Sequence, residues 1–247
     1  MNKFIACGRT DVGLKRQRNE DSYILESDYG LFILADGMGG HIGGDVASNM
    51  AIETASNFIK NALSDNDITW PFGLDDSLPR ELNAISSGIR LANRHIFTGN
   101  RERGTTIVVL LLSNEKAYIC HVGDSRLYRI RDNKMKQLTE DHSLVAEEVK
   151  RGTINKEKAR LHPLRHVITK TIGMNEDVKC DCIVENIINK DMFLLCSDGL
   201  SDMLDDSEIL SIIIEERDIE NSCERLILTA NEKGGDDNIT IILVRCR

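Results

Sequence analysis

Two short acidic turns hold the residues of this chain that are best placed to do chemistry. Asp36-Gly37 follows an apolar run at residues 31–34, and Asp198-Gly199 follows another at residues 192–195. A buried strand that ends in Asp-Gly places a carboxylate at the rim of a sheet, where glycine permits a tight turn. Carboxylates from two such rims could together bind a divalent metal ion. For either Asp-Gly pair taken alone, turn formation is the simpler explanation.

Further acidic residues at the ends of predicted strands could join the same site. They are Glu20, Asp21, Asp124, Asp236 and Asp237. Mg²⁺ and Mn²⁺ prefer carboxylate, carbonyl and water oxygens, so several carboxylates without histidine suit these ions better than zinc. Two such ions about 3.5–4 Å apart can share a water and convert it to a hydroxide that attacks phosphorus. Arg16 could hold the phosphate with its two-pronged guanidinium group.

Composition indicates an ordinary soluble globular protein. The chain has 247 residues, of which 41% are hydrophobic and 29% charged, and its net charge of -9 argues against nucleic acid as a partner. No segment reaches the roughly 20 apolar residues of a membrane span, and the apolar start is too short for a signal peptide. We therefore expect a cytoplasmic protein with no membrane partner.

The cysteines show no regular framework. Seven are spread along the chain, and the pair in Cys180-Asp181-Cys182 lacks the spacing of a zinc knuckle. This pattern favours reduced thiols over a disulfide scaffold.

The elements that must position the acidic residues are strands interrupted by two helix pairs. Helical periodicity predicts helices at about 45–59 and 82–96, separated by a polar loop, and later at 206–216 and 222–232. The expected strands cover residues 4–10, 22–26, 31–35, 105–112, 117–122, 126–130, 136–139, 182–188, 192–196 and 239–245. Their short connections favour antiparallel pairing.

This order of elements predicts the fold class α+β with four layers, α-β-β-α. Two antiparallel sheets would pack together, with a helix pair outside each. No repeat or long linker interrupts the sequence, so we expect one domain over residues 1–247.

Six motifs in a fixed order make the sequence resemble a known family. They are Arg16-Gln17-Arg18-Asn19-Glu20-Asp21, Asp36-Gly37-Met38-Gly39-Gly40, Gly104-Thr105-Thr106, Val122-Gly123-Asp124-Ser125-Arg126, Ser197-Asp198-Gly199 and Asp237-Asn238. Together they resemble the metal-dependent protein phosphatases of the type 2C serine/threonine class, particularly the bacterial branch. The resemblance runs from about Cys7 to Val244.

The resemblance implies a hydrolase that removes phosphate from phosphoserine and phosphothreonine on proteins. Its nucleophile would be a hydroxide bridging two Mn²⁺ or Mg²⁺ ions, with a weaker third ion nearby. Phosphorylated proteins would be its substrates in signal transduction, and a cognate serine/threonine kinase would be a natural partner. We expect a monomer.

The resemblance also assigns metal ligands. Asp36 would bridge both ions, and Glu20 and the backbone carbonyl of Gly37 would bind one of them. The second ion would be held by Asp198 and Asp237, and the third by Asp124 with Asp198. Asp237 is chosen over Asp236 because the family places this ligand directly before asparagine.

Three further residues take supporting roles in the same comparison. Arg16 matches the arginine that binds the substrate phosphate, so Arg16 and Asp36 are the expected catalytic residues. Asp21 and Asn238 would hydrogen-bond behind the metal ligands and orient them.

The sequence departs from the animal members of the family at Met38. They carry there a histidine proposed as the general acid, whereas bacterial members share the methionine. We expect a metal-bound water near Asp124 to donate the proton instead. His41 lies close by, but a histidine in a glycine-rich loop is more often solvated.

A polar segment at about 143–162 corresponds to a flap that lies beside the active site in this family. A plain surface excursion explains its composition equally well. His162, at the end of this segment, and His166, just beyond it, are expected to be structural and to border the site.

Two other functions remain open from the sequence. A pseudophosphatase acting as a binding module would have lost metal acids or Arg16, and all are present. An enzyme narrowed to one regulatory phosphoserine usually carries a sensor domain, for which this chain has no room.

Overall fold

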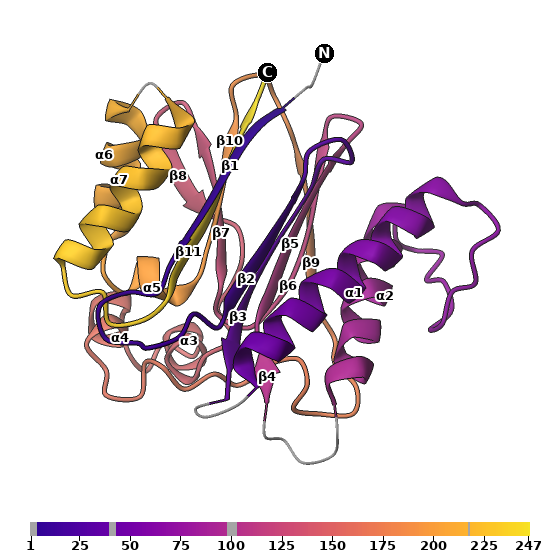
Figure 1. The fold of residues 1–247 in the computed structure, drawn as a ribbon, viewed down its shortest axis with the longest axis horizontal. Coiled ribbons are helices and arrows are strands. Elements are labelled where there is room, and N and C mark those ends of the chain that lie inside the picture. The colour runs from indigo at the N-terminus through magenta and orange to yellow at the C-terminus, as the bar shows by residue number, and fades with distance from the viewer. Residues whose placement is uncertain (1–3, 40–42, 98–102, 217) are drawn as a thin grey trace.

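Apolar strands build two antiparallel sheets that pack face to face (Figure 1). The structure is a computed structural model and describes residues 4–39, 43–97, 103–216 and 218–247. The first sheet has the order β1-β11-β10-β7-β8, with bounds Phe4–Asp11, Ile239–Cys246, Met192–Cys196, Arg126–Arg131 and Lys134–Gln137. The second has the order β2-β3-β5-β6-β9, with bounds Asp21–Glu26, Leu31–Met38, Ile107–Ser113, Lys116–Val122 and Asp181–Asn186. A short strand, β4 (Gly104–Thr105), pairs with the end of β3.

Helices cover the outer face of each sheet. α1 (Gly44–Ser64) and α2 (Arg80–Ile96) lie on the second sheet, and α6 (Asp206–Glu215) and α7 (Ile219–Glu232) lie on the first (Figure 1). A short helix, α5 (Asp198–Ser201), directly follows β10. The predicted α+β class with four layers is therefore confirmed.

The central strands are apolar on both faces because each sheet is covered on both sides. In β3, Phe32 and Leu34 pack between the sheets, while Leu31 and Ile33 contact the helices. In β10, Phe193 faces the other sheet in the same way. Burial of whole strands fixes the positions of the residues at their ends.

Some predicted boundaries are wrong, for local reasons. The strand expected at 105–112 is split into β4 and β5 at Thr106, whose backbone N–H donates to the Asp36 carbonyl at 2.8 Å. The strand expected at 136–139 corresponds to β8, which covers Lys134–Gln137. It begins earlier because Asp132 and Asn133 form a tight turn with positive φ angles of 51° and 55°. α7 begins at Ile219 because Asp218 caps its N-terminus.

The segment 143–162 contains two short helices, α3 (Leu144–Lys150) and α4 (Lys156–Arg160). Ser143 caps the first and Asn155 caps the second through their side-chain oxygens. Both helices lie at the end of the sheets opposite the chain termini (Figure 1).

The prediction of reduced thiols is wrong for one pair of cysteines. Cys120 on β6 lies directly opposite Cys182 on β9, and the two form a disulfide. The other five cysteines are free. Among the helices of the described residues, none combines the length and hydrophobicity that crossing a membrane requires.

Candidate metal centre

The ends of β2 and β3 bring three of the expected metal ligands together. Asp21 pairs with Asp36 in the β2–β3 ladder, and the Gly37 N–H donates to the Glu20 carbonyl at 3.1 Å. A methyl group on Gly37 would lie 2.2 Å from the Gly44 carbonyl oxygen, and one on Gly44 would lie 2.6 Å from Glu20 Oε2. Only glycine therefore lets β3, Glu20 and the start of α1 approach this closely.

The first sheet contributes Asp198 and Asp237 from the other side. Asp198 is the first residue of α5, directly after β10, and Asp237 lies two residues before β11. The neighbouring Ser197 hydroxyl donates to Asp21 Oδ2 at 2.8 Å and so joins the two sheets at the site.

Asn238 holds the loop that carries Arg16 and Glu20. Its Oδ1 accepts from the Glu20 N–H at 2.8 Å, and its Nδ2 donates to the carbonyls of Val12 and Arg18 at 2.9 Å each. Asn238 is buried, so these hydrogen bonds are shielded from water. Asn238 thus lies behind Glu20 and holds the backbone of that residue in place.

Burial and repulsion between carboxylates together shape the electrostatics of the site. Burial, followed by the charges of the neighbouring aspartates, raises the pKa of Asp36 and of Asp198 well above the usual range. Burial also raises the pKa of Asp21 and of Asp124 to about 7, as does repulsion from Asp237 and Asp141, respectively. The pKa of Glu20 is raised as well, mainly by burial and the charge of Asp45.

Buried oxygens without hydrogen-bond partners indicate which kind of ligand this group of carboxylates could bind. The Oδ1 atoms of Asp21, Asp124 and Asp198 are buried and have no hydrogen-bond partner among the described residues. A buried carboxylate without a partner is costly, and a bound cation would remove both this cost and the repulsion. Because these carboxylates offer oxygen ligands, they fit a hard divalent ion such as Mg²⁺ or Mn²⁺.

Arg16 lies at the edge of this group. Its Nη2 is 2.7 Å from Asp237 Oδ2, and its side chain is 54% exposed. Although partial burial opposes it, the charges of Asp237, Asp198 and Glu20 raise the pKa of Arg16. The guanidinium is thus positioned by one carboxylate while much of it faces solvent, as a phosphate-binding group requires.

Asp124 is positioned by the turn that follows β6. Gly123 has a positive φ of 109°, and its backbone N–H donates to the ring Nδ1 of His142 at 3.0 Å. The backbone N–H of His142 donates in turn to the Gly123 carbonyl at 3.0 Å. His142 also stacks on His121, whose Nε2 is 2.9 Å from the Glu140 carbonyl. These contacts fix the backbone next to Asp124.

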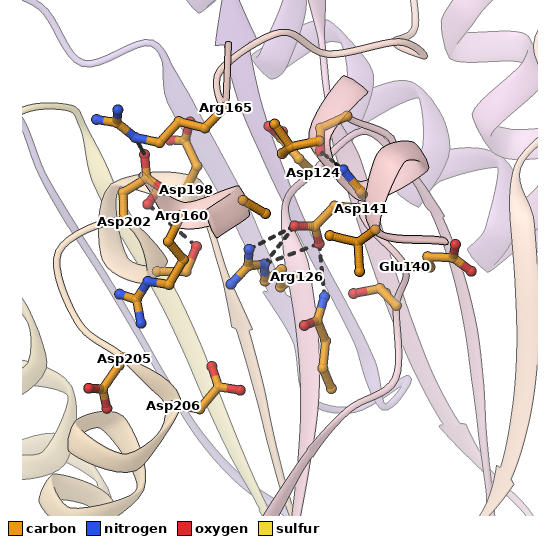
Figure 2. Close-up of a pocket in the computed structure, with 18 of the residues that line it drawn as sticks. Asp124, Arg126, Glu140, Asp141, Arg160, Arg165, Asp198, Asp202, Asp205 and Asp206 are labelled. Atoms are coloured by element: carbon orange, nitrogen blue, oxygen red, sulfur yellow. Dashed lines mark hydrogen bonds and ion pairs between the residues drawn. The ribbon is translucent and has the colours of Figure 1, made fainter. Parts of the chain in front are cut away.

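A pocket of about 730 Å³ opens beside Asp124 and Asp198. Residues of the segment 143–162, from Ser143 to Arg160, line one side of it, and α5 and the start of α6 line another. Figure 2 shows Asp198 and Asp202 across the pocket from Asp124 and Asp141, with Arg126 bound to Asp141 by paired hydrogen bonds.

Sequence reasoning missed Asp202. Its Oδ2 lies 3.3 Å from His166 Nδ1 and 3.8 Å from Arg165 Nε. Ligand atoms of His166, Asp198 and Asp202 all lie within 4.8 Å of one another. The four-residue spacing of Asp198 and Asp202 on a helix is the signal that could have found it. His166 borders the site as expected, whereas His41 lies outside the described residues.

Comparisons with known proteins agree with this geometry. A family model for protein phosphatase 2C matches residues 14–243. The serine/threonine phosphatase stp of Listeria welshimeri is 37% identical over 243 residues, which cover 96% of this chain and 93% of that protein. The solved structure of the serine/threonine phosphatase PstP/Ppp of Mycobacterium tuberculosis has a TM-score of 0.85 at 32% identity and covers 99% of each chain.

A further solved structure carries metal ions. The catalytic domain of the serine/threonine protein phosphatase PstP, in complex with two manganese ions, has a TM-score of 0.81 at 31% identity, covering 98% of this chain and 97% of that one. Fold, carboxylates and arginine together define a metal-dependent phosphatase. The chain belongs to the protein phosphatase 2C family and is a serine/threonine protein phosphatase.

The raised pKa values predict how stability depends on pH when metal is removed. A carboxylate whose pKa is higher in the folded state stabilises the fold below its unfolded pKa, and this contribution is lost as pH rises through the folded value. For Asp21 and Asp124 that value is about 7. In chelator, the urea midpoint should therefore fall as pH rises from about 5 to about 8.

Two variants and added metal sharpen this measurement. Asp21→Asn should flatten the pH dependence, whereas Asp28→Asn, at an exposed turn, should leave it unchanged. Excess Mn²⁺ should restore stability at the higher pH by binding the ionised carboxylates. A midpoint that rises with pH in chelator would contradict the electrostatic picture.

Proposed function

We propose that this phosphatase acts on phosphoserine and phosphothreonine with two Mn²⁺ or Mg²⁺ ions at the candidate metal centre. Asp36 would be shared between the ions, with Glu20 and the Gly37 carbonyl on one side and Asp198 and Asp237 on the other. The observation that carries this proposal is the set of buried carboxylate oxygens without partners. Asp124, with Asp198, would hold a weaker third ion.

The bound ions would lower the pKa of an attacking water and offset the charge on the phosphoryl oxygens. The chain itself supplies orientation. Arg16 would bind two phosphate oxygens, and its ion pair with Asp237 keeps the guanidinium at the edge of the site before substrate arrives. Asn238 and Asp21 would hold the ligands in place through the hydrogen bonds described above.

The pocket beside Asp124 supports a role for the segment 143–162 as a flap that contacts the substrate. Its lining combines apolar side chains from α3 with acidic residues of α5 and α6. Phosphorylated proteins are the proposed substrates, a serine/threonine kinase is the proposed opposing enzyme, and signal transduction the proposed role. We further propose a cytoplasmic monomer with one catalytic domain over 1–247.

The proton for the leaving group has no side-chain donor at the position of Met38. Met38 is the last residue of β3 and pairs with Gly104. Because a methionine side chain has no proton to donate, it cannot take the role of the histidine of animal members. The expectation that a water near Asp124 serves as the acid stays a prediction.

The most direct test of the ligand assignment compares neighbouring aspartates. Asp36→Asn and Asp237→Asn should each lower phosphopeptide hydrolysis in Mn²⁺ by at least about 100-fold, because even residues behind a metal ligand are typically worth 10–100-fold. Asp236→Asn is the matched control and should retain activity, since Asp236 is exposed. Hydrolysis that survives chelation, or Asp36→Asn, would overturn the proposal. A chain that binds phosphopeptide without hydrolysing it would be a binding module.

Arg16→Ala tests phosphate binding separately. Hydrogen bonds to charged groups contribute about 1.5–3 kcal/mol, so KM should rise about 10- to 150-fold with a smaller change in kcat. Arg94→Ala is the control, because Arg94 is exposed on α2 and packs over the Phe72 ring. An unchanged KM in Arg16→Ala would exclude this role.

A further inference from the structure

Three cysteine sulfurs converge at the edge of the second sheet. Cys120 on β6 faces Cys182 on β9 in the strand register, and Cys180 lies two residues before Cys182. Positions two apart on an extended chain point to the same face, here the face covered by α1 and α2. The Sγ atoms of all three lie within 4.8 Å of one another, and Cys180 Sγ is 3.5 Å from Cys182 Sγ.

A disulfide alone does not account for this arrangement. The bond between Cys120 and Cys182 uses two of the sulfurs, and the third remains a free thiol beside them. Reduction of the bond would leave three thiols at neighbouring positions on β6 and around the start of β9. Sulfurs bound at about 2.3 Å to a tetrahedral zinc ion lie about 3.8 Å apart. The non-bonded sulfurs of Cys180 and Cys182 lie 3.5 Å apart, which is close to that spacing.

The surroundings of the cluster suit an entering ion. Cys120 is fully buried, whereas Cys180 and Cys182 are half-buried, so solvent reaches one side. Burial raises the pKa of the Cys180 thiol. The charge of Lys170 opposes this increase, whereas the charge of Asp181, which is paired with Lys170 at 2.8 Å, adds to it. A bound metal ion would itself supply the positive charge that favours the deprotonated thiols.

We propose that Cys120, Cys180 and Cys182 form, in the reduced protein, a binding site for one thiophilic metal ion such as Zn²⁺. The fourth coordination position lies on the solvent side. Thiolates select soft or borderline ions, whereas Mg²⁺ and Mn²⁺ prefer oxygen, so this site is chemically distinct from the carboxylates. The ion would tie the edge strand β9 to β6, as the disulfide does in the oxidised protein.

Cobalt provides a probe that reports thiolates and ignores oxygen ligands. The protein is first treated with a phosphine, which reduces the disulfide to two thiols and becomes the phosphine oxide. Metals are then removed, and excess Mg²⁺ is added to fill the oxygen sites. Titration with Co²⁺ should produce a thiolate-to-cobalt charge-transfer band in the near ultraviolet that saturates at one ion per chain, and Zn²⁺ should abolish it.

Variants test whether the charge-transfer band arises from these three cysteines. Cys180→Ser and Cys182→Ser should each remove most of it, while Cys246→Ser, at a buried cysteine of β11 in the other sheet, should keep it. Asp36→Asn should also keep it, because Asp36 belongs to the carboxylate site. No band in the reduced wild-type protein, or a band unchanged in Cys180→Ser, would overturn the proposal.

A second measurement needs no variant. In the reduced wild-type protein, Zn²⁺ at ten times its dissociation constant should slow alkylation of Cys180 and Cys182 about tenfold, because only about one site in eleven stays free. Mg²⁺ should not slow it. Equal alkylation with and without Zn²⁺ would contradict the metal site.

Discussion

The repulsion among carboxylates gathered at one end of two packed sheets is the constraint on which this structure depends. Asp21 and Asp124 are buried, and the charges of Asp36 and Asp198 act on each other and on their neighbours. In a low-dielectric interior such charges cannot all remain ionised without a compensating cation. The fold therefore holds a locally unfavourable arrangement that divalent ions make favourable. The carboxylates that would bind the metal are thus the same groups that lower the stability of the metal-free fold.

The rest of the molecule keeps this arrangement rigid. The apolar layer between the sheets fixes the strand ends, and Ser197 and Asn238 connect the two sheets across the site through hydrogen bonds. Close backbone contacts that only glycine permits bring Glu20 to the start of α1. Arg16 is the more exposed member, and among the described residues it is held by one ion pair, with Asp237, so that much of its guanidinium is accessible to a phosphate. Buried carboxylates and an exposed cation suit binding of a metal and then of an anion.

Local patterns in the sequence were enough to predict both sheets, all four large helices and the carboxylates at the strand ends. Buried strands are read from apolar runs, and Asp-Gly marks where they stop. Asp202 could not be identified as a site residue in this way, because its contacts with Arg165 and His166 form only in the folded chain. The pairing of Cys120 with Cys182 depends on strand register across 62 residues, and local sequence does not determine that register. The role of the Gly37 carbonyl came from the family resemblance, which also supported the phosphate-binding role proposed for Arg16 from its guanidinium group.

Proton release on metal binding tests the central claim most directly. Titration calorimetry with Mn²⁺ in buffers of different ionisation enthalpy measures how many protons leave the protein as the ion binds. Near pH 6.5 we predict net release, since burial and repulsion raise the pKa values of Asp21 and Asp124 to about 7 and also raise those of Asp36 and Asp198. Binding without proton release, or binding unaffected by Asp36→Asn, would contradict the account.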